Sequence, residues 1–115
     1  MIVKKPPGFT RSEVAIIVRW AAGHARFHKV YLFGSRAKGG HRSDSDVDLA
    51  VILTEDERDG SLGHWICQAP IYRAGLIGKL PMPVDLQLAT GDDEVVMPAV
   101  REHGWLLYSS APERT

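Results

Sequence analysis

Residues 33–53, FGSRAKGGHRSDSDVDLAVIL, decide the fold of this 115-residue chain. They place a Gly-Ser turn, a run of small and basic residues, and three alternating acids directly before an apolar segment. Two carboxylates roughly 4 Å apart repel each other by about 4 kcal/mol when the effective dielectric constant is about 20. We therefore expect a cation to lie close to these acids.

Four segments have the composition of strands. Residues 46–53 end in the continuous apolar run LAVIL, which is typical of a central strand covered on both faces. Residues 29–33 form an apolar run before the turn, and residues 83–89 alternate between apolar and polar side chains. Residues 105–108 predict a final short strand.

Three segments favour helices. Thr10 and Glu13 form a capping box, which predicts a helix over residues 11–25 with an apolar face broad enough for deep burial or for a partner. Residues 61–80 are apolar but contain Pro70, so we expect a helix broken or kinked there. Residues 92–103 predict a helix with acids in its first turn.

These elements predict an α+β (mixed α/β) fold, in which a mixed sheet of three to four strands is flanked by helices. Residues 1–9 are expected to be an extended lead-in, residues 10–108 the one domain, and residues 109–115 a tail. A chain of this length holds one modest core and leaves no room for a separate substrate domain.

The composition excludes several classes of function. Fourteen basic and fourteen acidic residues cancel, which argues against a dedicated DNA-binding surface. We see neither an apolar run of about 18 residues nor a signal peptide, so we expect no membrane association and a cytoplasmic location. Cys67 is the single cysteine and we expect it in the core; with the five histidines it shows no zinc-ligand spacing.

The acids are the first part of a candidate active site. Asp46 and Asp48 lie two residues apart at the start of a strand, so their side chains leave the same face. Paired carboxylates suit a hard cation such as Mg²⁺. Asp85 is the only acid inside the third predicted strand, and it joins the pair if the second and third strands are neighbours. Three converging acids indicate metal-assisted phosphoryl transfer.

The Gly34-Ser35 turn is the second part. A glycine that ends a strand lets backbone N–H groups and the Ser35 hydroxyl approach phosphate oxygens, and Arg36 and Lys38 add positive charge. The segment lacks the Gly-Lys-Ser/Thr ending of a Walker loop. Taken alone, the turn could also be a plain turn. The alternating acids do not fit an EF-hand, because Leu49 stands where that loop needs glycine.

The combined pattern resembles a known family. Gly34-Ser35, ten intervening residues and then Asp46-x-Asp48 resemble the signature of nucleotidyltransferases of the polymerase-beta superfamily. The local sequence GSRAKG…SDVDL is similar to that of the minimal (MNT-type) branch of this superfamily. The similarity extends from the strand at residue 29 to the closing REHGWLLY. The resemblance implies the small nucleotidyltransferase fold.

The resemblance also implies roles for the site residues. Asp46 and Asp48 would ligate two Mg²⁺ ions, and Asp85 would be the third carboxylate, which helps to activate the attacking hydroxyl. Gly34 and Ser35 would grip the triphosphate of ATP, with Arg36 at a commonly basic position. The implied reaction transfers AMP from ATP to a hydroxyl and releases pyrophosphate. Asp44 lies outside the pair and is expected to be solvated.

The resemblance finally implies a partner. MNT-type proteins typically accompany HEPN-domain toxins, and there the antitoxin adenylylates a tyrosine of its partner. The alternatives are an antitoxin that acts by contact alone and an enzyme that modifies a small aminoglycoside-like molecule. Trp20, Trp65 and Trp105 are candidates either for the core or for a docking surface. The acceptor, the base preference and a homo- or hetero-oligomeric state stay open.

Overall fold

The structure is a computed structural model, and it describes residues 6, 9–40, 42, 45–54, 61–89 and 96–110. In chain order its elements are α1 (Arg11–Ala22), β1 (Phe27–Phe33), α2 (Ser35–Lys38), β2 (Val47–Leu53), α3 (Ser61–Ala74), β3 (Val84–Leu88), α4 (Val96–His103) and β4 (Trp105–Ser109). The mixture of helices and strands confirms the predicted α+β class. Within the described residues, no helix has both the length and the apolar character needed to cross a membrane.

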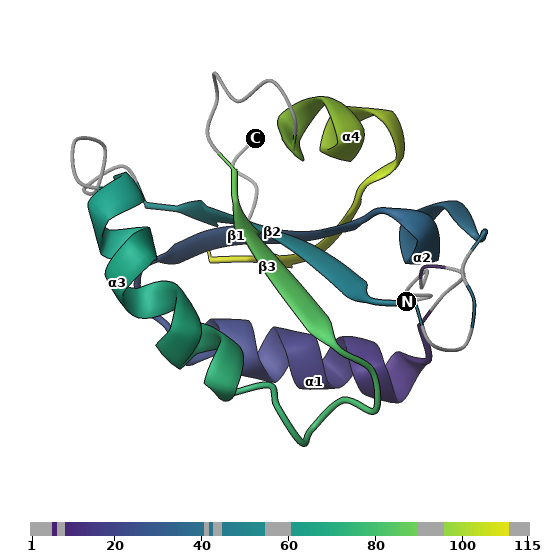
Figure 1. The fold of residues 1–115 in the computed structure, drawn as a ribbon, viewed down its shortest axis with the longest axis horizontal. Coiled ribbons are helices and arrows are strands. Elements are labelled where there is room, and N and C mark those ends of the chain that lie inside the picture. Colours follow the sequence, from purple (N-terminus) through teal and green to yellow (C-terminus); the bar gives the residue numbers. More distant parts are fainter. Residues whose placement is uncertain are drawn as a thin grey trace.

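The described strands form one mixed sheet in the order β3-β2-β1-β4 (Figure 1). β1 pairs antiparallel with β2 and with β4, whereas β2 and β3 are parallel. β2 and β1 are therefore the central strands, and β3 and β4 lie at the edges of this sheet. The prediction of a central strand over residues 46–53 is confirmed.

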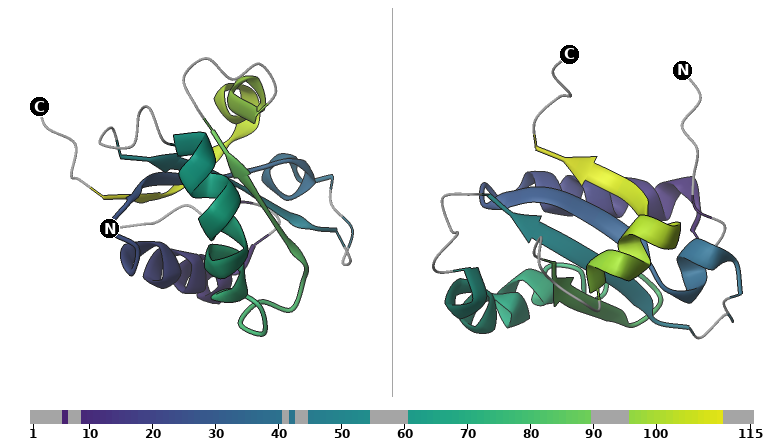
Figure 2. Two further views of the ribbon diagram at one scale, coloured as in Figure 1. Left: turned by 60° about the vertical axis from the view of Figure 1, so that its left-hand side comes forward. Right: turned by 90° about the horizontal axis from the view of Figure 1, so that it is seen from above.

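Helices cover both faces of the sheet. α1 and α3 lie against one face, and α4 lies on the opposite face (Figure 2). On the α1 and α3 side, Leu49 and Val51 of β2 belong to the main core. Ala50 points to the other face, where it packs with Val96 and Val100 of α4. This division explains why β2 is apolar at successive positions instead of alternating.

α1 begins as the sequence predicts. The Thr10 hydroxyl accepts the Glu13 N–H at 3.1 Å, and the Glu13 carboxylate accepts the Thr10 N–H at 2.9 Å. The helix ends at Ala22, three residues earlier than expected, because Gly23 caps it with an N–H bond to the Trp20 carbonyl.

The helix predicted over residues 61–80, broken or kinked near Pro70, is not broken there, since α3 runs without interruption from Ser61 to Ala74, where it ends. Proline removes the bond to the carbonyl of Ile66, but Ile66 and Pro70 both lie on the exposed side of the helix. Water can satisfy that carbonyl there. α4 confirms the later part of the predicted helix over residues 92–103, whereas residues 92–95 lie outside the described residues.

Candidate active site

The Gly34 turn lies directly against Asp48. Phe33, the last residue of β1, is paired with Asp48 of β2, so the chain leaves β1 over that carboxyl group. A Cβ atom on Gly34 would overlap the Asp48 carboxylate. Gly34 also has φ 80° and ψ −159°, a region open essentially to glycine alone. The turn and the second acid are therefore one site, and only glycine fits between them.

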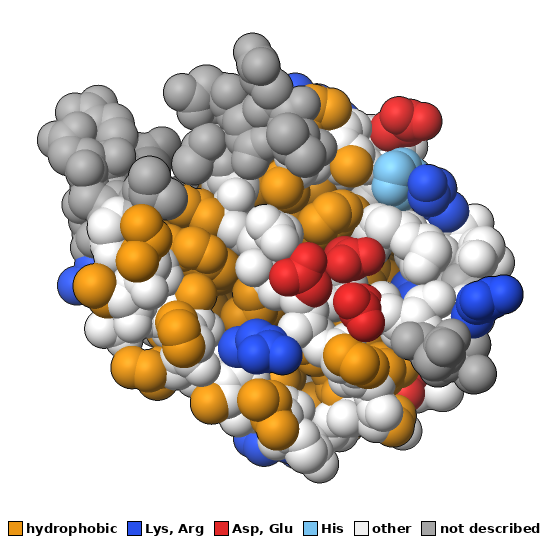
Figure 3. Space-filling view, in the orientation of Figure 1, with side chains coloured by type: hydrophobic (Ala, Val, Ile, Leu, Met, Phe, Trp, Pro, Cys, Tyr) orange, Lys and Arg blue, Asp and Glu red, His pale blue; other side chains and the backbone are white. Residues whose placement is uncertain are grey.

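The parallel register of β2 and β3 places the third acid beside the second. Asp48 and Asp85 are direct partners across the two strands. Asp46 is exposed just before β2, whose first residue, Val47, donates its N–H to the Pro83 carbonyl at 2.8 Å. The expectation that Asp85 joins Asp46 and Asp48 is thus confirmed as geometry. Figure 3 shows acidic side chains gathered at the centre of one face of the molecule.

Electrostatics at this cluster favour a bound cation. Partial burial raises the pKa of Asp48 above its ordinary value, and the negative charges of Asp85 and Asp46 raise it further. Carboxylate oxygens are the ligands that Mg²⁺ prefers, so the donor chemistry of the cluster fits such an ion. As the side chains stand, no group of three His, Cys, Asp or Glu residues in the described part of the chain is arranged to hold a metal ion. The carboxylates would have to turn toward it.

Gln87 orients one of these carboxylates. Its side-chain Nε2 donates to Oδ2 of Asp85 at 3.0 Å. The two residues lie two apart on β3, so their side chains share a face. The alternation predicted over residues 83–89 is consistent with this shared face, but no role in the site was predicted for Gln87.

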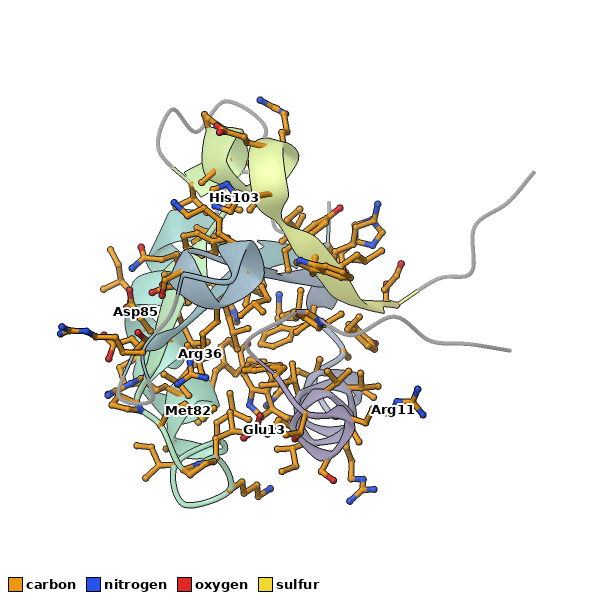
Figure 4. The ribbon with its side chains drawn as sticks, turned by 90° about the vertical axis from the view of Figure 1, so that its right-hand side faces the viewer. Arg11, Glu13, Arg36, Met82, Asp85 and His103 are labelled. Carbon is orange, nitrogen blue, oxygen red and sulfur yellow. The ribbon has the colours of Figure 1, made fainter. Side chains whose placement is uncertain are left out.

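Arg36 lies inside the molecule. Its side chain is only 5% exposed, its Nε donates to the Ser45 carbonyl at 3.1 Å, and its Nη2 lies 3.4 Å from the Arg42 carbonyl. In Figure 4 it lies below the short helix α2, on the same side of the molecule as Asp85. Arg36 therefore fastens the segment that leads into Asp46. Its predicted contact with phosphate stays a prediction.

The short helix α2 was not predicted, because four residues are too few to show a helical period. The Gly34 carbonyl accepts the N–H groups of Ala37 and Lys38 at 3.1 and 3.2 Å. Trp105, the first residue of β4, also contacts α2: its indole N–H donates to the Ala37 carbonyl at 3.1 Å. The turn is thus held on a rigid element, with Ser35 at its first position.

A groove of about 400 Å³ opens beside the acids, between α3 and the edge strand β3. Its walls combine Asp46 and Asp85 with a basic side chain, Arg73, and with apolar side chains such as Pro70 and Leu86. The Arg73 Nε donates to the Val84 carbonyl at 2.9 Å, directly before Asp85. Arg73 was not predicted as a site residue, because nothing in its local sequence sets it apart from other surface arginines.

Other expectations have mixed outcomes. Trp20 and Trp65 are buried in the core, which confirms that interpretation for both, and Trp105 is partly buried against it. Cys67 was expected in the core and is exposed, because it lies on the outward side of α3. Asp44 lies outside the described residues.

Comparison with known proteins agrees with this geometry. A family model described as polymerase beta, nucleotidyltransferase matches residues 17–113, so the chain belongs to the polymerase beta nucleotidyltransferase family. The match covers the turn and all three acids.

Solved structures show the same fold. A toxin–antitoxin solved with AMP-PNP is similar with a TM-score of 0.63 and 23% identity, over 84% of this chain and 73% of that one. Two mutant forms of the toxin–antitoxin MntA-HpeT are similar with TM-scores of 0.61. One shares 22% identity over 84% of this chain and 72% of that chain, and the other 24% over 87% and 74%.

Proposed function

We propose that this protein is a Mg²⁺-dependent nucleotidyltransferase that transfers AMP from ATP to a hydroxyl group of a protein partner. The observation that carries the proposal is that Asp48 lies against the Gly34 turn and beside both Asp46 and Asp85, in a chain that belongs to the nucleotidyltransferase family. The AMP-PNP in a similar solved structure supports ATP as the substrate.

Each residue has a part in the proposed reaction. Asp46, Asp48 and Asp85 would hold two Mg²⁺ ions, which neutralise charge on the triphosphate and lower the pKa of the acceptor hydroxyl. Gly34 lets the backbone approach the phosphates, and the Ser35 hydroxyl donates to them. Asp85 accepts the proton of the acceptor hydroxyl. The acceptor oxygen then bonds to the α-phosphorus, and pyrophosphate leaves with the electron pair of the broken P–O bond.

The proposed biological role is that of an antitoxin. The similar solved structures are toxin–antitoxin complexes, which supports a toxin as the partner. Together with the resemblance to MNT-type proteins, this leads us to propose a tyrosine of a HEPN-domain toxin as the acceptor, in the cytoplasm.

Labelled ATP tests the enzymatic proposal. The wild type and Asp46→Asn are incubated with α-labelled ATP, Mg²⁺ and cell extract. We expect labelled partner with the wild type and a loss of about a hundredfold or more with Asp46→Asn, because catalysis of this kind is mostly positioning and electrostatics. Glu102→Gln, an exposed change on α4, is the control and should keep full transfer. Equal labelling by wild type and Asp46→Asn contradicts the proposal.

A second candidate is an antitoxin that acts by contact alone, and the exposed apolar side chains of α3 favour it. Co-expression of Asp46→Asn/Asp48→Asn with the toxin distinguishes the two candidates. Loss of protection supports catalysis, whereas full protection supports contact.

A further inference from the structure

α3 is apolar on two sides, although only one side meets the core. Trp65 and Tyr72 face inward and are buried. On the outward side Ile66 is 67% exposed and Ile71 is 61% exposed, with Cys67 and Pro70 exposed between them. These four residues, the α3 stripe, lie at helical positions i, i+1, i+4 and i+5 and form one continuous face. A solvated helix face normally carries charged residues, so the stripe calls for a partner.

The α3 stripe runs into the groove beside the acids. Pro70 belongs to both, and the groove continues from it past Arg73 to Asp85 and Asp46. In Figure 3, hydrophobic side chains spread over α3, and a basic side chain lies next to the acidic cluster. A protein bound to the stripe could therefore extend along the groove to the carboxylates in one continuous contact.

The groove lies on the β3 side of the acids, away from the turn. Its lining comes from α3, β3 and Asp46, and includes no residue of the turn at residues 34–35 that would bind the triphosphate. The turn abuts Asp48 from β1, whereas the groove abuts Asp85, which is the partner of Asp48 on the opposite side of β2. A hydroxyl in the groove and a triphosphate at the turn would thus lie on opposite sides of Asp48. This placement is compatible with in-line displacement, in which the acceptor oxygen and the leaving pyrophosphate stand on opposite sides of the α-phosphorus.

We propose that the α3 stripe and the groove together form the docking surface for the protein that carries the acceptor hydroxyl. The occupant is a polypeptide that places apolar side chains on Ile66 and Ile71 and an acidic side chain on Arg73. The Nε of Arg73 is fixed on the Val84 carbonyl, which directs the rest of the guanidinium fork to a carboxylate. This inference extends the proposed function, because it assigns the partner-binding side of the same site.

Substitutions on the stripe test the proposal. The affinity for the HEPN-domain toxin proposed above is measured by calorimetry for the wild type, Ile66→Glu/Ile71→Glu and Arg73→Glu. We expect each variant to lose about tenfold or more in affinity, because apolar anchors and desolvated charges dominate binding. Mg²⁺·ATP binding should stay at the wild-type level in Ile66→Glu/Ile71→Glu, since the stripe does not touch the turn. Leu106→Glu, at an exposed position on the opposite edge strand β4, is the matched control.

Cys67 offers a second readout that needs no charge reversal. It is the only cysteine of the chain and lies within the stripe, so its rate of alkylation by a maleimide reports coverage of α3. Saturating partner should slow this rate by about tenfold or more. As a control, Glu102→Cys in a Cys67→Ser background places the only cysteine at an exposed position of α4. Its alkylation rate should be the same with and without the partner.

The outcomes separate this inference from the proposed function. Partner binding that survives the stripe changes within about twofold, or unprotected Cys67, overturns the docking surface even if AMP transfer is intact. Protection of Cys67 by a second copy of this chain, without the partner, overturns it in favour of self-association. A wild type that binds its partner through α3 but transfers no AMP contradicts the proposed function and leaves the docking surface standing.

Discussion

At the scale of single residues, Gly34 lets the backbone of the turn lie directly against the acidic cluster. Its conformation is open essentially to glycine, and its missing side chain makes room for the Asp48 carboxylate. The sequence predicted that glycine is needed at the turn. It did not predict that Asp48 is the group for which the space is needed, because that contact depends on the pairing of β1 with β2.

Replacement of Gly34 by alanine should therefore damage both stability and function. We expect Gly34→Ala to lower the free energy of unfolding by about 1–3 kcal/mol and to abolish AMP transfer. Chemical denaturation and the labelled-ATP assay measure the two effects.

Two other glycines separate the effect of the backbone conformation from the effect of the close approach to Asp48. Gly40 has no atom within 4 Å of an added Cβ, so Gly40→Ala should behave as wild type. Gly78 has φ 85° but open space, so Gly78→Ala should lose stability and keep transfer. If Gly34→Ala retains full transfer, the close approach to Asp48 has no function.

Arg36 is the second decisive residue, and its side chain holds the segment before Asp46. Arg36→Lys keeps the charge but cannot reach the Ser45 and Arg42 carbonyls together. We expect the free energy of unfolding to fall by about 2 kcal/mol, with reduced transfer. Lys38→Met, an exposed change on the same short helix, should leave the free energy of unfolding unchanged. Thermal unfolding of Arg36→Lys and Lys38→Met tests this prediction. Equal midpoints for the two variants would show that the buried guanidinium does not stabilise this segment.

At the scale of elements, α1, β1 and α3 meet around His24. Its ring lies 4.7 Å from that of Tyr72 and 4.8 Å from that of Phe27, measured between ring centroids. The Trp20 indole N–H donates to the Tyr72 carbonyl at 2.9 Å and ties α1 to α3. Burial in this cluster lowers the pKa of His24 below its ordinary value.

This shift predicts a dependence of stability on pH. Because the folded pKa of His24 is lower than the unfolded one, the unfolded chain takes up the proton more readily. The stabilisation is complete above about pH 6.5 and is lost as the pH falls below that value. We expect urea denaturation to show a steeper loss of stability between about pH 8 and pH 5.5 in wild type than in His24→Gln. Parallel curves for the two proteins would contradict the role of His24.

The elements also show where sequence reasoning reached its limit. The strand over residues 46–53 was predictable because five consecutive apolar residues are covered on both faces. Residues 83–89 were predictable from alternation. The continuity of α3 was not, since a proline is tolerated only where its freed carbonyl meets solvent, and exposure is a tertiary property. The same reason explains the wrong assignment of Cys67 to the core.

At the scale of the whole molecule, the fold brings like charges together. The strand order β3-β2-β1-β4 puts Asp85 beside Asp48, and without this order the three acids would not form a site. From the sequence, the convergence of the three acids depended on the unproven assumption that β2 and β3 are neighbours, because no local pattern determines which strands pair. Arg73 was missed for that reason, because its partner is the Val84 carbonyl before Asp85, on a different element. Gln87 bonds to Asp85 on its own strand, and it becomes part of the site only when β3 pairs with β2.

The collected charges should destabilise the metal-free protein. Asp48 is partly buried beside Asp85 and Asp46, so its ionised form costs free energy in the fold. We expect Asp48→Asn to be more stable than wild type at neutral pH in EDTA, while it loses AMP transfer. Thermal unfolding measures the difference, and Glu102→Gln, away from the cluster, should show no gain. A lower midpoint for Asp48→Asn would mean that the acids do not repel one another in the folded chain.

Calorimetric titration of ATP into the protein, with Mg²⁺ and with EDTA, tests most directly whether the turn and the acids act as one metal-dependent nucleotide site. The account predicts binding by the wild type with Mg²⁺, and a loss of affinity of about tenfold or more in EDTA or in Asp48→Asn with Mg²⁺. Binding of equal strength under all three conditions, or no binding by the wild type with Mg²⁺, would contradict it.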